Sequence, residues 1–222
     1  MRILIAGQKE FGAAVFRLAL RLGHEVVAVA CPLFGSNGKS ADRLLDAARI
    51  YNVPRVDRLE AASVPENLDL IVTAHSHDFV GRATRDRAKW GAVGYHPSLL
   101  PRHRGRDAVR WAIKMNDPVT GGSIYWLNEV MDGGPIALQK WCWIEPGETA
   151  EDLWRNKLFS IGVELFDEVL SDVPKFFGLK EKQDAAVATF EPACNPPRAY
   201  RPDLLRLPLH CDKKHPVELM GP

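Results

Sequence analysis

The chain has 222 residues and a formal net charge of +1, from 29 lysine and arginine residues against 28 aspartate and glutamate residues. This length allows one large domain, or one domain with a small appendage, and a core of that size folds without disulfides or metals. The balanced charge argues against a dedicated nucleic-acid-binding protein and against an acidic disordered chain, and the sequence has no run of about 18 apolar residues that would span a membrane.

Strands and helices alternate in the first half of the chain, as judged from hydrophobic periodicity. The expected elements are, in chain order, a strand at residues 2–6, a helix at 10–22, a strand at 24–30, a helix at 40–51, strands at 53–56 and 68–74, a helix at 80–90 and a short strand at 92–95. Ser40 is expected to cap the helix that it begins, because a serine side chain accepts a hydrogen bond from the free backbone N–H groups there.

The second half adds a helix at residues 108–115, two β-rich segments at 121–128 and 136–144, and an amphipathic helix at 149–171. The two β-rich segments have no helix between them, so they are expected to be antiparallel neighbours. The apolar side of the last helix consists of Leu153, Leu158, Ile161, Leu165 and Val169.

Together these elements predict an α/β protein with a Rossmann-like sheet, mixed but mostly parallel, and helices on both faces. Ligands of such sheets bind outside the carboxyl ends of the strands. Functional residues are therefore expected in the loops that follow Ala6, Ala30, Ala74 and Tyr95.

The four cysteines, Cys31, Cys142, Cys194 and Cys211, are far apart and form no CxxC pair. Reduced thiols are therefore expected rather than a disulfide framework or a zinc site, with Cys31 and Cys142 in strands. The apolar run at the amino terminus is too short and too strand-like for a signal peptide, which predicts a cytoplasmic protein.

Two segments resemble ligand-binding motifs without matching them. The loop at residues 35–40 ends like a P-loop, but the position five residues before Gly38 holds Leu33, where the motif needs glycine. His75 and His77 have no third ligand near them in the sequence. They are interpreted as polar lining of a cleft, so no metal site is expected.

His96 and Asp132 form a candidate acid–base pair. His96 directly follows a short apolar strand, and Asp132 precedes two glycines in the turn between the two late strands. Each residue alone is typical of a structural role, since aspartate is common in turns. A histidine at the carboxyl end of a strand, together with an aspartate on a glycine turn, favours proton-transfer chemistry.

The sequence around this pair resembles a known family. The run YHPSLLPRHRG at residues 95–105 resembles the SLLP signature of the formyltransferases that use 10-formyltetrahydrofolate, and MDGGPI at 131–136 resembles their D-x-G-P-[IL] segment. The resemblance covers roughly residues 1–172. It is strongest to the hydrolase domain of 10-formyltetrahydrofolate dehydrogenase, through the opening GQ-xx-FG, the loop at 75–80, the LLPRHRG run and the stretch LQKxCxxxPxxT.

The resemblance implies the formyltransferase fold, 10-formyltetrahydrofolate or tetrahydrofolate as cofactor, and a mechanism. A nucleophile attacks the formyl carbon, and a hydrogen-bond donor stabilises the resulting oxyanion. A protonated His96 is the implied donor, while Asp132 is implied to orient the nucleophile, keep His96 charged and accept a proton directly or through water. The implied folate contacts are Asp78, Phe79 and Val80 on one wall, Ser98, Leu99, Leu100 and Pro101 on the other, and Val130.

One position departs from the family pattern. Most of its transferases carry asparagine two residues before the catalytic histidine, where this chain has Gly94. Loss of one oxyanion donor typically lowers the rate by about 100- to 1000-fold. The ordered motifs make transfer to an amine the first hypothesis. Gly94 favours the second, a hydrolase that releases formate, and a catalytically weakened folate-binding protein is the third.

Two acceptors of the family are disfavoured. The segment GQKEFG after the first strand differs from the glycine-rich phosphate loop of glycinamide ribonucleotide formyltransferases. A tRNA acceptor is disfavoured because only some 50 residues follow the last helix, too few for the carboxy-terminal barrel, and because the net charge is +1. A small amine or a sugar nucleotide is left open as acceptor, as is a homodimer.

Four arginines and a proline-rich tail complete the sequence. The arginines, Arg102, Arg104, Arg106 and Arg110, fit either attraction of an anionic substrate or a solvated helix surface. Seven of the 16 prolines lie within residues 190–222. This predicts a catalytic domain at 1–175 and an irregular extension at 176–222, within which residues 190–203 are expected to pack over the body as a strap.

Overall fold

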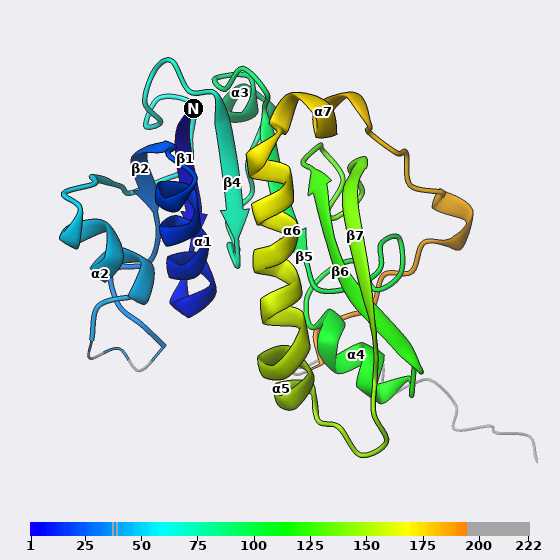
Figure 1. Cartoon of the computed structure of the whole chain (residues 1–222). Helices are drawn as coiled ribbons and strands as arrows, with labels where there is room; N and C mark the ends of the chain where they lie inside the picture. Colours follow the sequence, from blue (N-terminus) through cyan, green and yellow to red (C-terminus); the bar gives the residue numbers. More distant parts are fainter. Residues whose placement is uncertain (37, 39, 195–222) are drawn as a thin grey trace, which may run out of the picture.

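The computed structural model describes residues 1–36, 38 and 40–194, and within them the chain forms a seven-stranded sheet with the order β3-β2-β1-β4-β5-β6-β7 (Figure 1). The strands are β1 (Arg2–Gly7), β2 (Glu25–Ala30), β3 (Arg55–Val56), β4 (Leu70–Ala74), β5 (Ala92–His96), β6 (Val119–Trp126) and β7 (Ile136–Trp143). The α-helices are α1 (Lys9–Arg21), α2 (Arg43–Ile50), α3 (Arg82–Arg85), α4 (Ala108–Lys114), α5 (Ala150–Leu153), α6 (Phe159–Ser171) and α7 (Val173–Gly178).

The sheet is mixed, as the sequence predicts. Strands β1 to β5 are parallel to one another, whereas β6 is antiparallel to both β5 and β7. The carboxyl ends of β1, β4 and β5 therefore meet at one edge of the sheet, where the loops after them lie close together.

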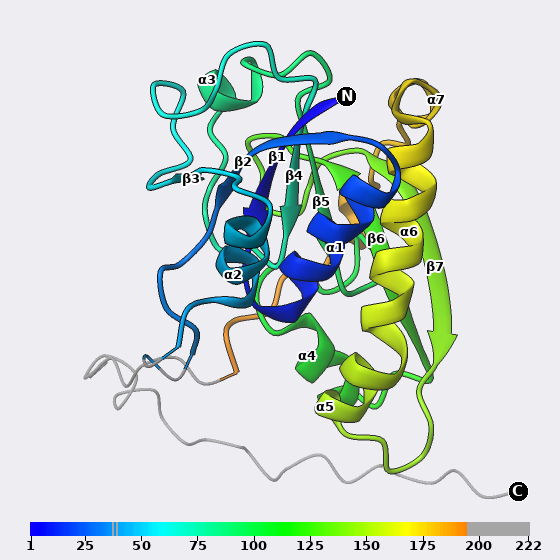
Figure 2. The same ribbon diagram turned by 60° about the vertical axis from the view of Figure 1, so that its left-hand side comes forward.

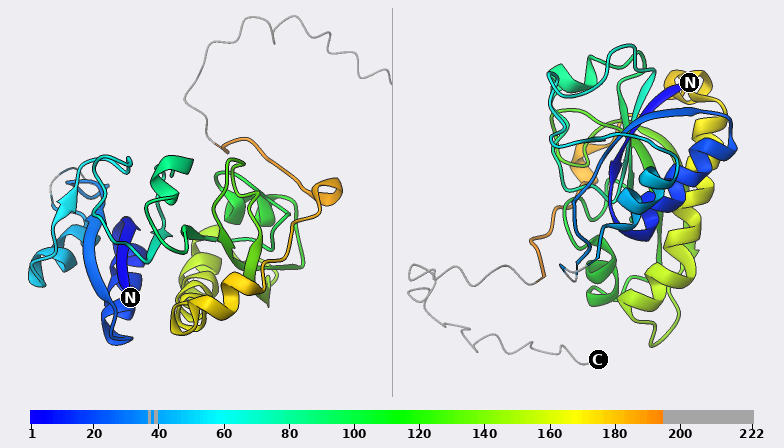
Figure 3. Two further views of the ribbon diagram at one scale, coloured as in Figure 1. Left: turned by 90° about the horizontal axis from the view of Figure 1, so that it is seen from above. Right: turned by 90° about the vertical axis from the view of Figure 1, so that its left-hand side faces the viewer.

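Helices α1, α2 and α6 lie in a row across one face of the sheet (Figure 2). Their apolar sides enclose the larger core, and the residues predicted for the apolar side of the last helix are all buried there. The opposite face is covered by α3 and by the segments around it, whose buried members include Leu59, Val64, Leu68 and Ala88 (Figure 3).

The predicted start of α2 is wrong, because Asp42 rather than Ser40 caps this helix. The Asp42 carboxylate accepts a hydrogen bond from the Leu44 backbone N–H at 2.9 Å, so the helix begins at Arg43. The capping aspartate therefore satisfies one of the free N–H groups that every helix leaves at its start.

The helix predicted at residues 80–90 is shorter than expected. Only Arg82–Arg85 are helical, because the backbone N–H groups of Lys89 and Trp90 donate to the carbonyls of Leu68 and Asp69 at 2.9 and 2.8 Å. Backbone groups paired with an incoming strand are no longer available to a helix. The late helix runs from Ala150 to Ser171, close to the predicted range, but contains a π-helical turn at Trp154–Leu158.

Three cysteines, Cys31, Cys142 and Cys194, are free thiols, and Cys211 lies outside the described residues. Cys142 is in β7 as predicted, whereas Cys31 follows the end of β2. None of the described helices has the length and apolarity that crossing a membrane requires.

After α7 the chain returns across the body as a segment of residues 180–194, which we call the strap (Figure 1). Its Glu181 exchanges backbone hydrogen bonds with Ile136 at 2.7 and 2.9 Å. Further along, the Thr189 N–H donates to Pro101 and the Thr189 carbonyl accepts from Arg104. The strap thus packs on the body, but most of the segment 190–203 for which packing is predicted lies outside the described residues. A domain boundary at residue 175 stays a prediction.

Candidate active site

The end of β5 places His96 in the interior, where the residue is only 6% exposed. Its Nε2 lies 2.6 Å from the carbonyl oxygen of His103. A carbonyl only accepts hydrogen bonds, so this contact requires a proton on Nε2. The other nitrogen, Nδ1, faces the carboxylate of Asp132 at 3.5 Å. The structure therefore brings together the two residues that the sequence predicts as a pair.

Asp132 is held from two sides in the turn between β6 and β7. Its backbone has a positive φ of 50°, and one carboxylate oxygen accepts the Gly105 N–H at 2.7 Å. The other oxygen accepts the hydroxyl of Tyr125 at 2.6 Å. These contacts orient the carboxylate toward His96 and leave it little freedom to rotate.

Tyr125 is a site residue that the sequence does not reveal. It lies on β6 directly opposite Gly94 on β5, and this register cannot be read from the sequence. Burial, and next the charge of Asp132, raise the pKa of Tyr125 well above its ordinary value. The hydroxyl therefore stays protonated and acts as a hydrogen-bond donor to Asp132.

Gly94 has no room for a side chain. A Cβ atom built on it would lie 2.5 Å from Oγ1 of Thr73 and 3.1 Å from Cδ1 of Leu127. The first separation is too short for a non-bonded contact and the second is tight, so a larger residue here requires Thr73 and Leu127 to shift. The absence of the family's asparagine is therefore built into the packing between β4, β5 and β6.

The loop that follows His96 is held by internal hydrogen bonds. The Ser98 hydroxyl donates to the Arg102 carbonyl, and Ser123 donates to the Ser98 carbonyl, both at 2.6 Å. Leu100 is buried against Tyr125 in a small apolar cluster. Of the predicted folate contacts in this loop, Ser98 and Leu100 are thus buried, while Leu99 and Pro101 are partly exposed.

The other predicted folate contacts differ in exposure. Phe79 is 69% exposed and Val130 is 56% exposed, which is unusual for large apolar side chains. Asp78 is exposed as well, whereas Val80 is buried in the core of the second face. The side chains of Phe79, Val130 and Asp78 are therefore accessible to a ligand, whereas Val80 can contact a ligand only through its backbone.

The four arginines do not form one free basic patch. Arg102 pairs with Asp117 at 2.6 Å, and Arg110 lies 3.7 Å from Asp107. Arg104 donates to a side chain of the strap, and Arg106 is exposed. Three of the four therefore have partners within the protein, which favours the interpretation of a structural surface for them.

His75 and His77 lie at the carboxyl end of β4, with their ring centres 5.8 Å apart. Burial, followed by the charges of Lys9 and His77, lowers the pKa of His75 to about 4. Burial, followed by Arg106 and Lys9, also lowers the pKa of His77. Within the described residues, no three metal-binding side chains gather here or elsewhere.

The low pKa of His75 predicts acid sensitivity of the fold. Between pH 6.5 and about 4 the unfolded chain binds a proton at this histidine that the folded chain does not, so stability falls as the pH drops through this window. At about 1.4 kcal/mol per pKa unit, the loss reaches about 3 kcal/mol. Denaturant unfolding at several pH values is expected to show a shallower acid loss in His75→Asn, where asparagine tolerates the positive φ of this position.

The same substitution at the exposed His77 is expected to change the acid loss less. Equal slopes for the wild-type protein and His75→Asn between pH 6.5 and 4 would contradict the assignment of this titration to His75.

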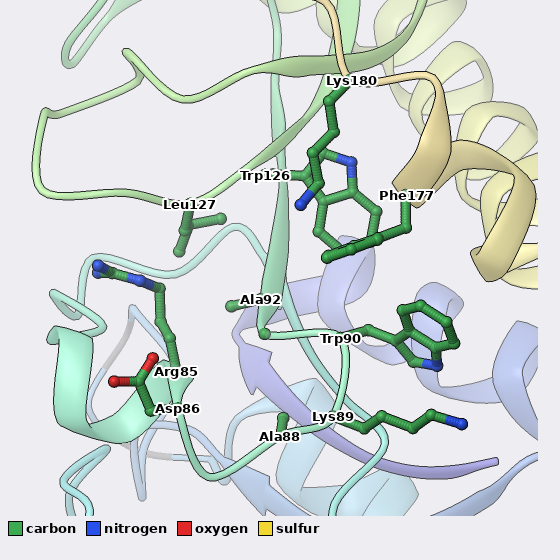
Figure 4. Close-up of a pocket in the computed structure, with 11 residues that line it drawn as sticks. Arg85, Asp86, Ala88, Lys89, Trp90, Ala92, Trp126, Leu127, Phe177 and Lys180 are labelled. Carbon is green, nitrogen blue, oxygen red and sulfur yellow. The ribbon is translucent and has the colours of Figure 1, made fainter.

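A separate cavity of about 500 Å³ lies beside Ala92 at the amino end of β5, away from His96. Its lining includes Arg85, Lys89 and Lys180. The charged ends of these three side chains point in different directions (Figure 4), so they do not converge on one anion. The candidate site is therefore the His96 region.

Residues 41–170 match the model of the formyl transferase family, which is more than half of the chain. The chain is 31% identical over 204 residues to the cytosolic 10-formyltetrahydrofolate dehydrogenase of Xenopus laevis, a match that covers 86% of this chain and 22% of the relative. The chain thus spans about a fifth of the length of this dehydrogenase.

Solved structures confirm the fold. The phosphoribosylglycinamide formyltransferase of Bacillus halodurans superposes with a TM-score of 0.64 at 23% identity, over 78% of this chain and 95% of that one. An N-formyltransferase of Helicobacter canadensis, solved with folinic acid and dTDP-3-aminofucose, superposes with a TM-score of 0.67 at 19% identity, over 85% of this chain and 70% of that one.

Proposed function

Because the chain belongs to the formyl transferase family, we propose that it moves the formyl group of 10-formyltetrahydrofolate to an amine, with His96 and Asp132 as the catalytic pair. The observation that carries the proposal is the approach of His96 Nδ1 to the Asp132 carboxylate at the carboxyl end of β5. The names of the similar dehydrogenases and the folinic acid in the Helicobacter canadensis structure support the choice of a folate as formyl donor.

The proposed reaction begins with attack of the amine nitrogen on the formyl carbon. Since Nε2 of His96 is committed to the His103 carbonyl, Nδ1 is the nitrogen that donates to the developing oxyanion when the ring is protonated. Asp132 accepts the proton that the amine loses, directly or through water. The bond from carbon to N10 then breaks, N10 takes up a proton, and tetrahydrofolate and the formylated amine leave.

The exposed side chains beside this pair fit the folate. Phe79 follows β4, Val130 lies two residues before Asp132, and both present apolar surface to the solvent. A pterin ring has flat apolar faces that such side chains contact. We propose that Asp78, Phe79 and Val80 contact the pterin on one side and Leu99 and Pro101 on the other. Ser98 and Leu100 shape this second wall from within.

The contacts of Asp42 bear on the acceptor. This carboxylate is 1% exposed and accepts the Lys9 N–H at 2.9 and 3.1 Å, in addition to the Leu44 N–H. Backbone N–H groups that follow a first strand and start a helix are ready binding groups for phosphate, but here the Asp42 carboxylate occupies the first of them, that of Lys9. This favours an acceptor without a phosphate at that position, such as a small amine, over a ribonucleotide.

Hydrolysis is the second candidate, favoured by Gly94. Because no side chain fits at this position, no asparagine amide assists His96 at the oxyanion, and the Tyr125 hydroxyl is engaged by Asp132. Water in place of the amine would release formate and tetrahydrofolate.

Incubation of the purified protein with 10-formyltetrahydrofolate, with and without candidate amines, tests the proposal. Turnover that depends on an amine supports transfer, and formate release without an amine supports hydrolysis. Binding of tetrahydrofolate without either reaction would contradict both and would indicate a folate-binding protein.

Substitution of Gly94 by the family's asparagine is expected to destabilise the protein without raising its activity. In Gly94→Asn the new side chain meets Thr73 and Leu127, so the free energy of unfolding is expected to fall by about 1–3 kcal/mol, as in other overpacked cores. Denaturant unfolding measures the loss, and amine-dependent turnover is expected not to rise.

Gly178→Asn is the matched control, because a Cβ at Gly178 meets no atom within 4 Å. A fully stable Gly94→Asn variant with faster formyl transfer would show that the crowding at this position does not exclude the asparagine.

A further inference from the structure

The strap contributes a buried glutamine, Gln183, whose side chain is fully used in hydrogen bonds. The residue is 6% exposed, and its Oε1 accepts from Nε and Nη2 of Arg104 at 3.0 and 2.7 Å. Its Nε2 donates to the carbonyls of Asp132 and Gly134 at 2.8 and 2.6 Å. A guanidinium only donates and a carbonyl only accepts, so the partners fix the orientation of the amide.

These four hydrogen bonds join the two segments that hold the catalytic pair. Arg104 is next in sequence to His103, whose carbonyl binds His96. On the other side Gln183 binds the backbone of Asp132 itself, in the turn whose positive φ orients the carboxylate. The side chain of Gln183 thus spans from the support of the histidine to the support of the aspartate.

The strap is anchored on both sides of this glutamine. Before it, Glu181 pairs with Ile136 at the start of β7. After it, Thr189 pairs with Pro101 and Arg104 in the loop that follows His96. Because the backbone is hydrogen-bonded at these two places, the amide of Gln183 has support besides its own bonds to the Asp132 turn.

We infer that Gln183 is a positioning residue that sets the separation of His96 and Asp132, an inference that rests on the proposed function for its effect on rate. Catalytic groups act only within a narrow range of geometry, and a displacement of about 1 Å costs up to about 100-fold in rate. The effect belongs to kcat rather than to folate binding, because Gln183 contacts the supports of the pair and not the exposed apolar side chains proposed for the pterin.

Two variants of Gln183 separate its contacts. Gln183→Met keeps the length of the side chain and removes all four hydrogen bonds. Gln183→Glu keeps acceptors for Arg104 but places carboxylate oxygen against the carbonyls of Asp132 and Gly134. For both variants we expect kcat with 10-formyltetrahydrofolate to fall by about 10- to 100-fold and KM to change by less than about threefold.

A second measurement does not depend on turnover. The Gly105 N–H donates to the Asp132 carboxylate, so its hydrogen exchange, followed by NMR, reports whether the aspartate is in place. We expect this amide to exchange at least about tenfold faster in both variants than in the wild-type protein.

The matched controls are Lys182→Met, an exposed neighbour on the strap, and Val169→Ala, a core truncation in α6. Val169→Ala is expected to lower the melting temperature, and both controls are expected to keep kcat and the Gly105 exchange rate within about twofold of the wild type.

Each remaining outcome decides one of the two proposals. The inference is overturned if Gln183→Met and Gln183→Glu keep the kcat and the Gly105 exchange rate of the wild type. It is also overturned if Val169→Ala has the same melting temperature as the Gln183 variants and loses as much kcat as they do. A wild-type protein without turnover refutes the proposed function, and the exchange of Gly105 still decides whether Gln183 holds Asp132 in place.

Discussion

Replacement of His96 by asparagine is expected to lower kcat with 10-formyltetrahydrofolate by about 100- to 1000-fold, the range found when one oxyanion donor is removed. The asparagine amide is a neutral donor and has no counterpart of Nε2, so the variant loses the positive charge that attracts the oxyanion and the hydrogen bond to His103 that orients the ring. KM is expected to change by less than about threefold, because the pterin contacts are unaltered. Steady-state kinetics at saturating folate measure the effect.

His24→Asn is the matched control for this substitution. His24 also places its Nε2 against a backbone carbonyl, that of Leu170 at 3.0 Å, but it precedes β2 at the opposite end of the sheet. The control is expected to keep the wild-type kcat. Turnover above a tenth of the wild-type rate in His96→Asn would assign the donor role to another group and would remove the basis of the proposed mechanism.

The fold is largely predictable because its signals are local. Continuous apolar runs predict β1, β2 and β4, and the periodicity from Leu153 to Val169 predicts the late helix, since burial alone determines these patterns. The errors occur where a distant partner competes. Asp42 takes the capping role expected of Ser40, and strand residues near Leu68 pair with the segment predicted to continue α3.

The candidate site is predictable in part for the same reason. His96 can be predicted because it follows a predicted strand at the edge where ligands bind, and Asp132 because it lies in the turn between two predicted strands. Tyr125 and Gln183 are not visible, because their roles depend on strand register and on the path of the strap. A tyrosine in a strand and a glutamine in an irregular tail carry no local signal for contacts made 7 and 51 residues away in sequence.

The supports of His96 and Asp132 differ in kind. His96 is held through the His103 backbone, which is anchored where the His103 ring lies between Asp117 at 2.8 Å and Glu191 at 3.1 Å. Asp132 is held through its own carboxylate, by donors from two separate segments. A change at position 132 therefore disturbs its supports as well as its chemistry.

Replacement of Asp132 by asparagine is accordingly expected to lower kcat by about 100- to 10,000-fold, the range for loss of a general acid–base group. Asparagine has the same shape, but it cannot accept the proton of the nucleophile and it removes the negative charge that faces the His96 ring. Its amide also cannot accept from both Gly105 and Tyr125, because one of its two polar atoms is now a donor. Steady-state and single-turnover kinetics measure the loss.

Asp69→Asn and Tyr125→Phe separate these causes. The Asp69 carboxylate accepts the Arg2 N–H at 2.8 Å, far from His96, so Asp69→Asn is expected to keep the wild-type rate. Tyr125→Phe leaves the Asp132 charge and removes only one donor, so its loss of rate is expected to be smaller than that of Asp132→Asn. If Tyr125→Phe and Asp132→Asn lower kcat by the same factor, the orientation of the carboxylate limits the reaction. If Asp132→Asn alone is inactive, its proton transfer limits the reaction, and a wild-type rate in Asp132→Asn excludes the pair altogether.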